Sequence, residues 1–525
     1  MAVIEDKSAP GTLQLIDENG ELHVKHSTAA KDIVLVPMPS VMYTVMMVFP
    51  SSAVYSVTTP ISKATSLTVN DLVSGTGAMF LFYGWGCIIW QALALQYGKR
   101  PAYLLSMAVS IVIMGVTPLC TTNGPYLATK ILQGFFGAPV ESLCEISMTD
   151  IWFSHERPLF LAVYGLSLAA SGKLAPVFAA FINTGMGWKW TLWWCAIGMG
   201  VSFVYCFFLM EETNYDRHLP VSTISAGNST DEVSEPTVVG DEKGGAADEK
   251  NVLPLREEVV ESGQITYPRK TYWQKLSVTG DKKRPNRILE VMWSPFKFFT
   301  FPVVVWAGFM YGTNALVWPG ILNATASPTY TKIYGFNSNE VGFAYFGAVV
   351  GMVLGSLWVS YVGPRLVMRL ARRNKGVAEP EHILWLFLAS LISVPFAMLL
   401  WGLGAANHIH WFGLVFAQCM LAISSTLCLS TAIQYATSAY RDLGGELITT
   451  IILIRNTLSF AINYGITPWI DAEGQRNTFI TVAAIALVCN ATMLPAIWWG
   501  KGFRMRSAGR YWAWVEAARA KGLSH

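Results

Sequence analysis

Twelve long apolar stretches dominate this 525-residue chain and set most of what it can fold into. Each is about 20 residues long, the length that an α-helix needs to cross the hydrocarbon core of a membrane. Because a backbone in lipid has to satisfy its own hydrogen bonds, such stretches fold as helices. They lie at about 41–60, 74–96, 102–120, 126–148, 159–182, 190–210, 299–321, 341–362, 383–404, 411–434, 446–468 and 478–500.

The composition argues against most soluble functions. Only 14% of the residues are charged, whereas soluble proteins average about 25%. A net charge of +3 is too small to attract a nucleic acid. The chain has no Gly-x-x-x-x-Gly-Lys phosphate loop and no catalytic or metal-ligand spacing, so we expect no ATP, no cofactor, no metal and no enzyme activity. The eight cysteines form no C-x-x-C pair and lie mostly in apolar runs, where we expect them to pack.

The apolar stretches fall into two groups of six, separated by a polar segment. Two such halves are typical of transporters that carry a substrate along a path between them. Within the polar segment, residues 231–261 are rich in Gly, Ser and acidic residues, and we expect them to be disordered. Residues 269–287 hold seven Lys or Arg, which either bind anionic lipid or only fix the topology. The predicted parts are a tail (1–40), a first half (41–210), a linker (211–298), a second half (299–500) and a tail (501–525).

Lysine and arginine in short loops predict which side of the membrane each loop faces. If the N-terminus is inside, the inner loops carry nine such residues and the outer loops carry four. We therefore expect both termini and the linker to be cytoplasmic. The inner residues are Lys99, Arg100, Arg157, Arg365, Arg369, Arg372, Arg373, Lys375 and Arg441, and the outer ones are Lys63, Lys189, Lys332 and Arg476.

Short motifs connect the chain to a known family. Residues 91–101 read Gln-Ala-Leu-Ala-Leu-Gln-Tyr-Gly-Lys-Arg-Pro, and residues 130–138 read Lys-Ile-Leu-Gln-Gly-Phe-Phe-Gly-Ala. Residues 171–180 combine Pro176 with small residues. These stretches resemble the loop 2–3, fourth-span and fifth-span motifs of the major facilitator superfamily. The resemblance is to fungal members of its drug:H+ antiporter-1 group, in the branch around the yeast histidinol/polyamine transporter.

This resemblance implies an all-α fold of twelve transmembrane helices in two six-helix halves. It also implies a secondary transporter that moves a metabolite, drug or toxin across a fungal plasma membrane by alternating access, coupled to protons. Its conformational motif residues are Gly98, Lys99, Arg100, Lys130 and Pro176. The loop motif usually has Gly and Asp where this chain has Gln91 and Leu95, so the latch that the Asp provides is not carried over. The alternative is a transporter-like membrane sensor that signals through its linker and tails.

Five ionisable residues fall inside predicted spans: Lys130, Glu141, Glu145, Lys173 and Arg455. A charge at mid-membrane costs about 3 kcal/mol on insertion scales, and such residues are usually functional. Glu141 and Glu145 are four residues apart and share one helix face. Because the two carboxylates repel and are buried, we expect one of them to handle a proton. The alternative is that both are inert partners of Lys or Arg.

Lys173 and Arg455 raise the question of substrate charge. At a rise of 1.5 Å per residue, Glu141 and Lys173 lie roughly 16 and 22 Å above their cytoplasmic helix ends, which allows a Glu141–Lys173 pair. The alternative is a lone Lys173 that holds an anion. Arg455 occupies the equivalent span of the other half, which favours a carboxylate-bearing substrate. The same Arg-Asn occurs in the resembling branch, where cations are carried, so a packing role beside Asn456 stays open.

Polar and aromatic residues complete the predicted site. We expect Gln133 and Asn456 to donate hydrogen bonds to a small-molecule substrate. Tyr311, Asn314 and Trp318 are spaced i, i+3, i+7 and share a helix face, which either lines the path or packs. Asn323-Ala-Thr325 is a glycosylation sequon on the predicted outer side.

Overall fold

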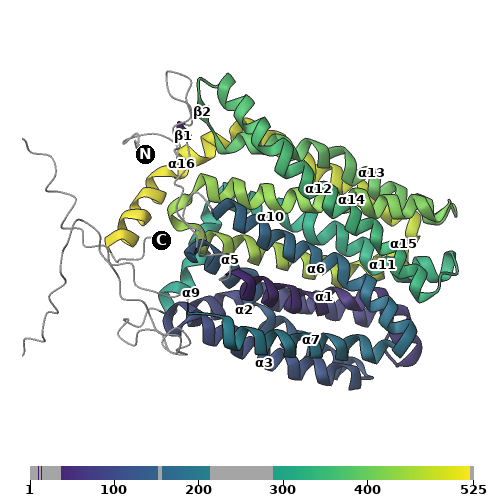
Figure 1. Cartoon of the computed structure of the whole chain (residues 1–525). Coiled ribbons are helices and arrows are strands. Elements are labelled where there is room, and N and C mark those ends of the chain that lie inside the picture. Colours follow the sequence, from purple (N-terminus) through teal and green to yellow (C-terminus); the bar gives the residue numbers. More distant parts are fainter. Residues whose placement is uncertain (1–9, 11–12, 15–36, 152–156, 213–287, 521–525) are drawn as a thin grey trace, which may run out of the picture. The chain divides into compact units, whose positions relative to one another are not determined.

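The computed structural model describes residues 10, 13–14, 37–151, 157–212 and 288–520. Nearly all of these residues are helical (Figure 1). The helices before and after residues 213–287 pack into one unit. Residues 231–261 and the basic strip 269–287 lie outside the described residues.

The described part of the first half consists of seven α-helices and a short 3-10 helix at Thr117–Leu119. Five of its six predicted spans are single helices, whereas the fourth is divided into two. The helices are α1 (Pro37–Ala64), α2 (Val69–Tyr97), α3 (Lys99–Val116), α4 (Asn123–Gly137), α5 (Pro139–Ile151), α6 (Arg157–Met186) and α7 (Trp188–Leu209).

The second half begins with α9 (Ile288–Lys297), a helix inside the stretch that the sequence assigns to the linker. Its seventh span contains a π-helix at Thr313–Val317, and a 3-10 helix at Pro380–Phe387 precedes α13. The other helices are α10 (Pro302–Gly312), α11 (Trp318–Ile333), α12 (Ser338–Arg373), α13 (Leu388–Ala406), α14 (Trp411–Ala439), α15 (Gly444–Ala491) and α16 (Met493–Ala520).

All twelve predicted stretches lie on these helices. Within the described ranges, nine helices are long and apolar enough to cross a membrane, or ten if the segments Ile288–Thr300 and Pro302–Ile333, which meet at a bend of 93°, count as one broken span. The remaining two of the twelve predicted spans are not counted as separate long helices, because one is merged with its neighbour and the other is divided. Gly474, with φ at 79°, bends α15 between the eleventh and twelfth spans, and α4 and α5 divide the fourth. The fold class agrees with the sequence prediction.

The halves meet along α2 and α15, and again along α6 and α12. Small residues allow this close approach. A Cβ added to Gly84 of α2 would lie only 2.8 Å from Asn456 Cβ of α15. A Cβ added to Gly342 of α12 would lie 2.7 Å from Ala180 Cβ of α6. Pro176 is buried one turn before Ala180, so the fifth-span motif lies at the contact between the halves.

A charged contact closes the first half at its predicted cytoplasmic end. Gly98 turns the chain between α2 and α3 with φ at 117°, a conformation that favours glycine. The backbone amides of Lys99 and Arg100 each donate a hydrogen bond of 3.0 Å to the Glu212 carboxylate, just after α7. The Arg100 guanidinium also donates to the Phe207 carbonyl. These motif residues therefore join the third and sixth spans of one half.

The second half has a contact at the corresponding place, but it is made by side-chain ion pairs. Here the acids Glu379 and Glu381 lie at the start of the ninth span, and the bases lie on α16, after the twelfth. Arg504 is fully buried, and its guanidinium bonds both carboxylates at 2.6 to 2.8 Å. Lys501 donates to Glu379 at 2.8 Å. Each half thus ties its third span to its sixth through carboxylates at this end of the bundle, by backbone amides in the first half and by the Arg504 and Lys501 side chains in the second.

A short piece of the N-terminal tail joins this second cluster. Strand β1 (Leu13–Gln14) pairs antiparallel with β2 (Val377–Ala378), directly before Glu379. The Arg504 guanidinium donates to the Pro10 carbonyl. The sequence analysis did not predict either strand. Pro10 and the helix α16 therefore meet at the same end of the bundle.

Arg504 gives a test of this cluster. Arg504→Gln leaves two buried carboxylates without their shared partner, and breaking such a pair costs about 3–5 kcal/mol. We expect a clearly lower Tm for the purified full-length protein in detergent. Arg506→Gln is the matched control, because Arg506 is exposed two residues away on the same helix. Equal Tm values for the two variants would contradict the assignment.

The cluster also predicts how stability responds to acid. Burial by itself raises the pKa of Glu379, but hydrogen bonds from Lys501 and Arg504 outweigh it and lower the pKa below the usual 4.5. The stabilisation by Glu379 is therefore complete above pH 4.5 and is lost as the pH falls through the lowered value. We expect the Tm of Glu379→Gln to fall less than that of the natural sequence between pH 5 and pH 3. A parallel fall in both proteins would argue against the ionised cluster.

Candidate functional site

A cavity of about 130 Å³ lies between the two halves. Its wall comes from α1, α2, α5 and α6 on one side and from α10, α11, α14 and α15 on the other, together with the π-helix. Among the residues expected to bind substrate or protons, Glu141, Lys173, Tyr311 and Arg455 line it. Sequence analysis did not single out Ser51, Ser52 or Thr426, whose hydroxyls carry no pattern that distinguishes them from helix-packing residues.

Pro139 places Glu141 on the cavity wall. Proline has no amide hydrogen, so the carbonyl of Phe135 loses the helical bond that residue 139 would donate. Trp90 Nε1 donates to that carbonyl instead, at 2.8 Å. The break ends α4 and starts α5, and Glu141 stands in the first turn of the new helix. A carboxylate is favoured there because the helix N-terminus carries partial positive charge.

Glu141 forms an ion pair with Arg455 that joins the two halves. The guanidinium of Arg455, on α15, bonds the Glu141 carboxylate on α5. It also donates to the Tyr311 hydroxyl at 2.7 Å and to Asn456 Oδ1 at 3.1 Å. Arg455 is only 3% exposed. The predicted Glu141–Lys173 pair is therefore wrong, because the base from the opposite half reaches the carboxylate.

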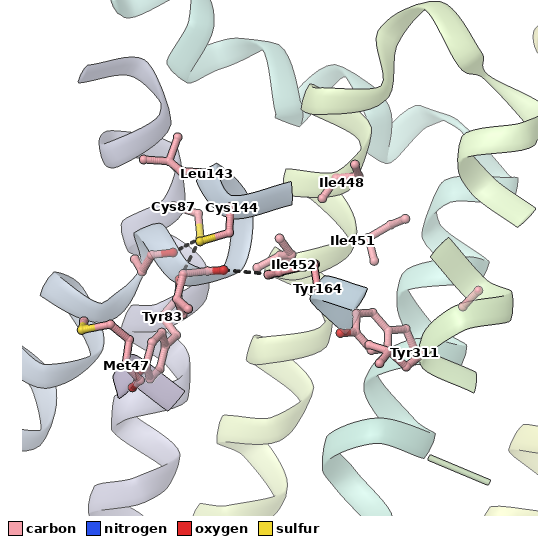
Figure 2. Close-up of a cluster of buried hydrophobic side chains, with 14 of the residues drawn as sticks. Met47, Tyr83, Cys87, Leu143, Cys144, Tyr164, Tyr311, Ile448, Ile451 and Ile452 are labelled. Carbon is pink, nitrogen blue, oxygen red and sulfur yellow. Dashed lines mark hydrogen bonds between the residues drawn. The ribbon is translucent and has the colours of Figure 1, made fainter. Parts of the chain in front are cut away.

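An apolar layer adjoins the ion pair on its predicted cytoplasmic side. Figure 2 shows side chains of both halves in this layer, with Leu143 and Cys144 from α5 and Ile448, Ile451 and Ile452 from α15. All five are at most 4% exposed. A packed apolar layer leaves no space for water. It therefore separates the ion pair from that end of the bundle.

Lys173 and Glu145 have no bonded partners among the described residues. Lys173 lies on the cavity wall from α6, without a hydrogen bond or ion pair. This position agrees with the alternative of a lone lysine. Glu145 is 5% exposed, one turn beyond Glu141 on α5, and it does not line the cavity.

The face of the seventh span differs from the prediction. Tyr311 lines the cavity, but the wall then continues through Ala315 and Pro319 rather than through Asn314 and Trp318. The π-helix at Thr313–Val317 causes this shift, because its wider turn moves the face by one residue. Asn314 is fully buried, and Trp318 packs in an apolar cluster of the second half.

Gln133 and Asn456 also lie away from the cavity wall. Gln133 Oε1 accepts a hydrogen bond of 2.9 Å from Lys130 Nζ, and both side chains are buried inside the first half. Lys130 also lies over the Tyr126 ring. Asn456 orients Arg455 and packs against Gly84. Gln133, Asn456 and Lys130 therefore do not line the cavity in this structure.

Asn323 is placed differently from the sequence expectation. It lies on α11 and lines the central cavity. The hydroxyl of Thr325 bonds helix carbonyls and accepts from Trp401 Nε1 at 3.1 Å. A glycosylated asparagine needs a surface loop, so this placement contradicts the predicted modification. Asn323 is instead a polar group of the cavity.

Comparison with known proteins fits this arrangement of halves, motifs and cavity. Residues 41–462 match the sequence profile of the Major Facilitator Superfamily. The chain belongs to the major facilitator superfamily. The twelve-span, two-half fold and the function of a secondary transporter follow from membership.

Similar proteins include fungal transporters of this superfamily. An uncharacterized MFS-type transporter of Schizosaccharomyces pombe is 23% identical, covering 96% of this chain and 94% of the relative. Protein HOL1 of Saccharomyces cerevisiae is also 23% identical, covering 84% and 81%. The xylose transporter XylE from E. coli, in a partially occluded inward open conformation, has a TM-score of 0.55 at 10% identity over 88% of this chain and 98% of XylE. This likeness shows the shared fold.

Gln91 stands where the major facilitator loop motif usually has glycine, and its side chain contacts the opposite half. Its side-chain oxygen accepts a hydrogen bond from the Thr449 hydroxyl of α15, in the opposite half. Beside it, a Cβ on Gly445 would lie 3.8 Å from Gln91 Nε2 and from Ile146. The motif position that is usually glycine thus supplies a contact between the halves.

The ion pair predicts different stability effects for two glutamates on one helix. Glu141→Gln leaves the Arg455 charge buried and unpaired, at a cost of about 3–5 kcal/mol. Glu145→Gln removes no hydrogen bond or ion pair within the described part of the chain, so we expect little change. Thermal unfolding of the purified protein measures both. A larger loss for Glu145→Gln than for Glu141→Gln would refute the pairing.

Proposed function

We propose that this major facilitator moves a small organic molecule by alternating access and that protons drive the movement. The observation that carries this proposal is the buried Glu141–Arg455 pair between the halves. Substrate binds in the cavity beside the pair, and rocking of the halves exposes the cavity to one side of the membrane at a time.

Protonation of Glu141 is the proposed coupling step. While Glu141 is ionised, its attraction to Arg455 holds α5 against α15. A proton on the carboxylate removes that attraction, which is strong where water is excluded. The halves then separate more easily, and the Arg455 guanidinium becomes available. Protonation of Glu141 and binding of substrate are linked in this way, because both depend on whether the Glu141–Arg455 ion pair is formed.

The orientation belongs to the same proposal. The excess of Lys and Arg in one set of loops favours cytoplasmic termini. The contact between Pro10 and Arg504 supports the placement of both ends on one side. In a fungal cell, the plasma membrane is the proposed location.

A flux assay tests the coupling. The purified protein is reconstituted in vesicles, and uptake of labelled metabolites, toxins and polyamines is measured with and without an imposed pH gradient. The natural sequence should respond to the gradient. Glu141→Gln should keep exchange of labelled for unlabelled substrate at equal pH but lose the response to the gradient, because glutamine cannot carry the proton.

Glu473→Gln is the control for this assay. It makes the same substitution at an exposed position near the outer end of the eleventh span, so it should retain the full response. Full pH dependence in Glu141→Gln would remove Glu141 from the coupling step. Absence of flux for every candidate would favour the sensor function.

A further inference from the structure

The charges on the cavity wall do not balance. Within the described ranges, Glu141, Lys173 and Arg455 are the charged residues that line it. Glu141 and Arg455 neutralise each other through their ion pair. The Lys173 ammonium remains as one uncompensated positive charge. An unpaired charge at this depth is costly, and a bound anion would offset that cost.

Polar groups on the wall extend this positive site. Ser52 on α1 lies beside Gly172, the residue before Lys173, because a Cβ on Gly172 would be 3.6 Å from Ser52 Oγ; Ser52 and Lys173 both line the cavity. Asn323 contributes an amide from α11 in the opposite half. Neither Ser52 nor Asn323 makes a side-chain hydrogen bond to another described residue. An ammonium, a hydroxyl and an amide together offer donors to an oxyanion.

The rest of the wall is largely apolar. Leu168 is on α6 with Lys173, and Phe80, Leu316 and Pro319 come from other helices. These side chains suit the body of a molecule whose polar end is small. A cationic substrate would meet repulsion from Lys173, and the one carboxylate on the described wall is already bonded to Arg455.

We propose that the substrate is an organic monoanion with an apolar body, and that its carboxylate binds the Lys173 ammonium. This inference rests on the proposed function, because it takes the cavity as the substrate path. Ser52 and Asn323 donate to the same carboxylate or its neighbouring polar atoms. A substrate held in this way contacts both halves, since Lys173 and Asn323 lie on opposite sides of the cavity wall.

Binding to matched probes tests the charge preference without a flux measurement. The purified full-length protein in detergent at pH 7 is heated with 3-phenylpropionate, 3-phenylpropionamide or 3-phenylpropylamine at equal concentration. A second set uses hexanoate, hexanamide and hexylamine. Ligands that bind the folded state raise the Tm. We expect the two acids to raise it by about 2 °C or more, and the amides and amines to have little effect.

Variants of Lys173 assign the effect to this residue. Lys173→Met should weaken the binding of the acids at least about tenfold, whereas Lys173→Arg should retain it. Lys189→Met is the matched control, because Lys189 is exposed in the first turn of α7. Lys173→Gln replaces Lys173→Met if the latter does not elute as a folded species from gel filtration.

Three results would overturn the proposal: a preference for the amines, equal stabilisation of Lys173→Met by the acids, or no stabilisation of the natural sequence by either acid. The flux response of Glu141→Gln is measured separately. A pH-coupled flux of a cation would therefore reject the anion and leave the proposed function in place. Binding of the acids without pH-coupled flux would support the anion and reject proton coupling through Glu141.

Discussion

Polar groups inside a bilayer have no water to bond, and much of the interior of this protein follows from how those groups find partners. Where Pro139 leaves the Phe135 carbonyl without its helical donor, the Trp90 indole supplies one. Arg455 distributes its charge among a carboxylate, a hydroxyl and an amide oxygen. The partners come from different helices, so satisfying each group also fixes how the helices pack.

The same requirement separates structural charges from functional ones. At the predicted cytoplasmic end, the Arg504 guanidinium is fully buried and bonded to two carboxylates and a carbonyl. The corresponding place in the first half carries an acid after α7 and bases at the start of α3. There the backbone amides of Lys99 and Arg100 donate to the Glu212 carboxylate, so both halves join the third and sixth spans through a bonded carboxylate. In contrast, Lys173 faces the cavity without a hydrogen-bond or ion-pair partner among the described residues, and we propose that it binds a ligand.

Several parts of the structure could be predicted from the sequence. A run of about 20 apolar residues has one stable form in lipid, so the positions of the spans, the two halves and the costly charges followed directly. Family motifs supplied the fold. The site was only partly predictable. The i, i+3, i+7 rule assumes an uninterrupted α-helix, and the π-helix before Pro319 moved Asn314 and Trp318 away from the wall. The sequon at Asn323 is a local sequence pattern, whereas the position of Asn323 on the cavity wall depends on the neighbouring helices.

The sequence by itself determined that this chain spans a membrane, because hydrophobicity and the backbone's need for internal hydrogen bonds act locally along each stretch. It also identified which residues bring charge into the bilayer. Only the tertiary structure decided which charges meet. The carboxylate of Glu141 bonds Arg455 rather than Lys173 because the contact between the halves brings together residues that are far apart in the chain. Ion pairing depends on distances of a few ångströms between side chains of different helices. Those distances cannot be derived from the spacing of residues along one helix.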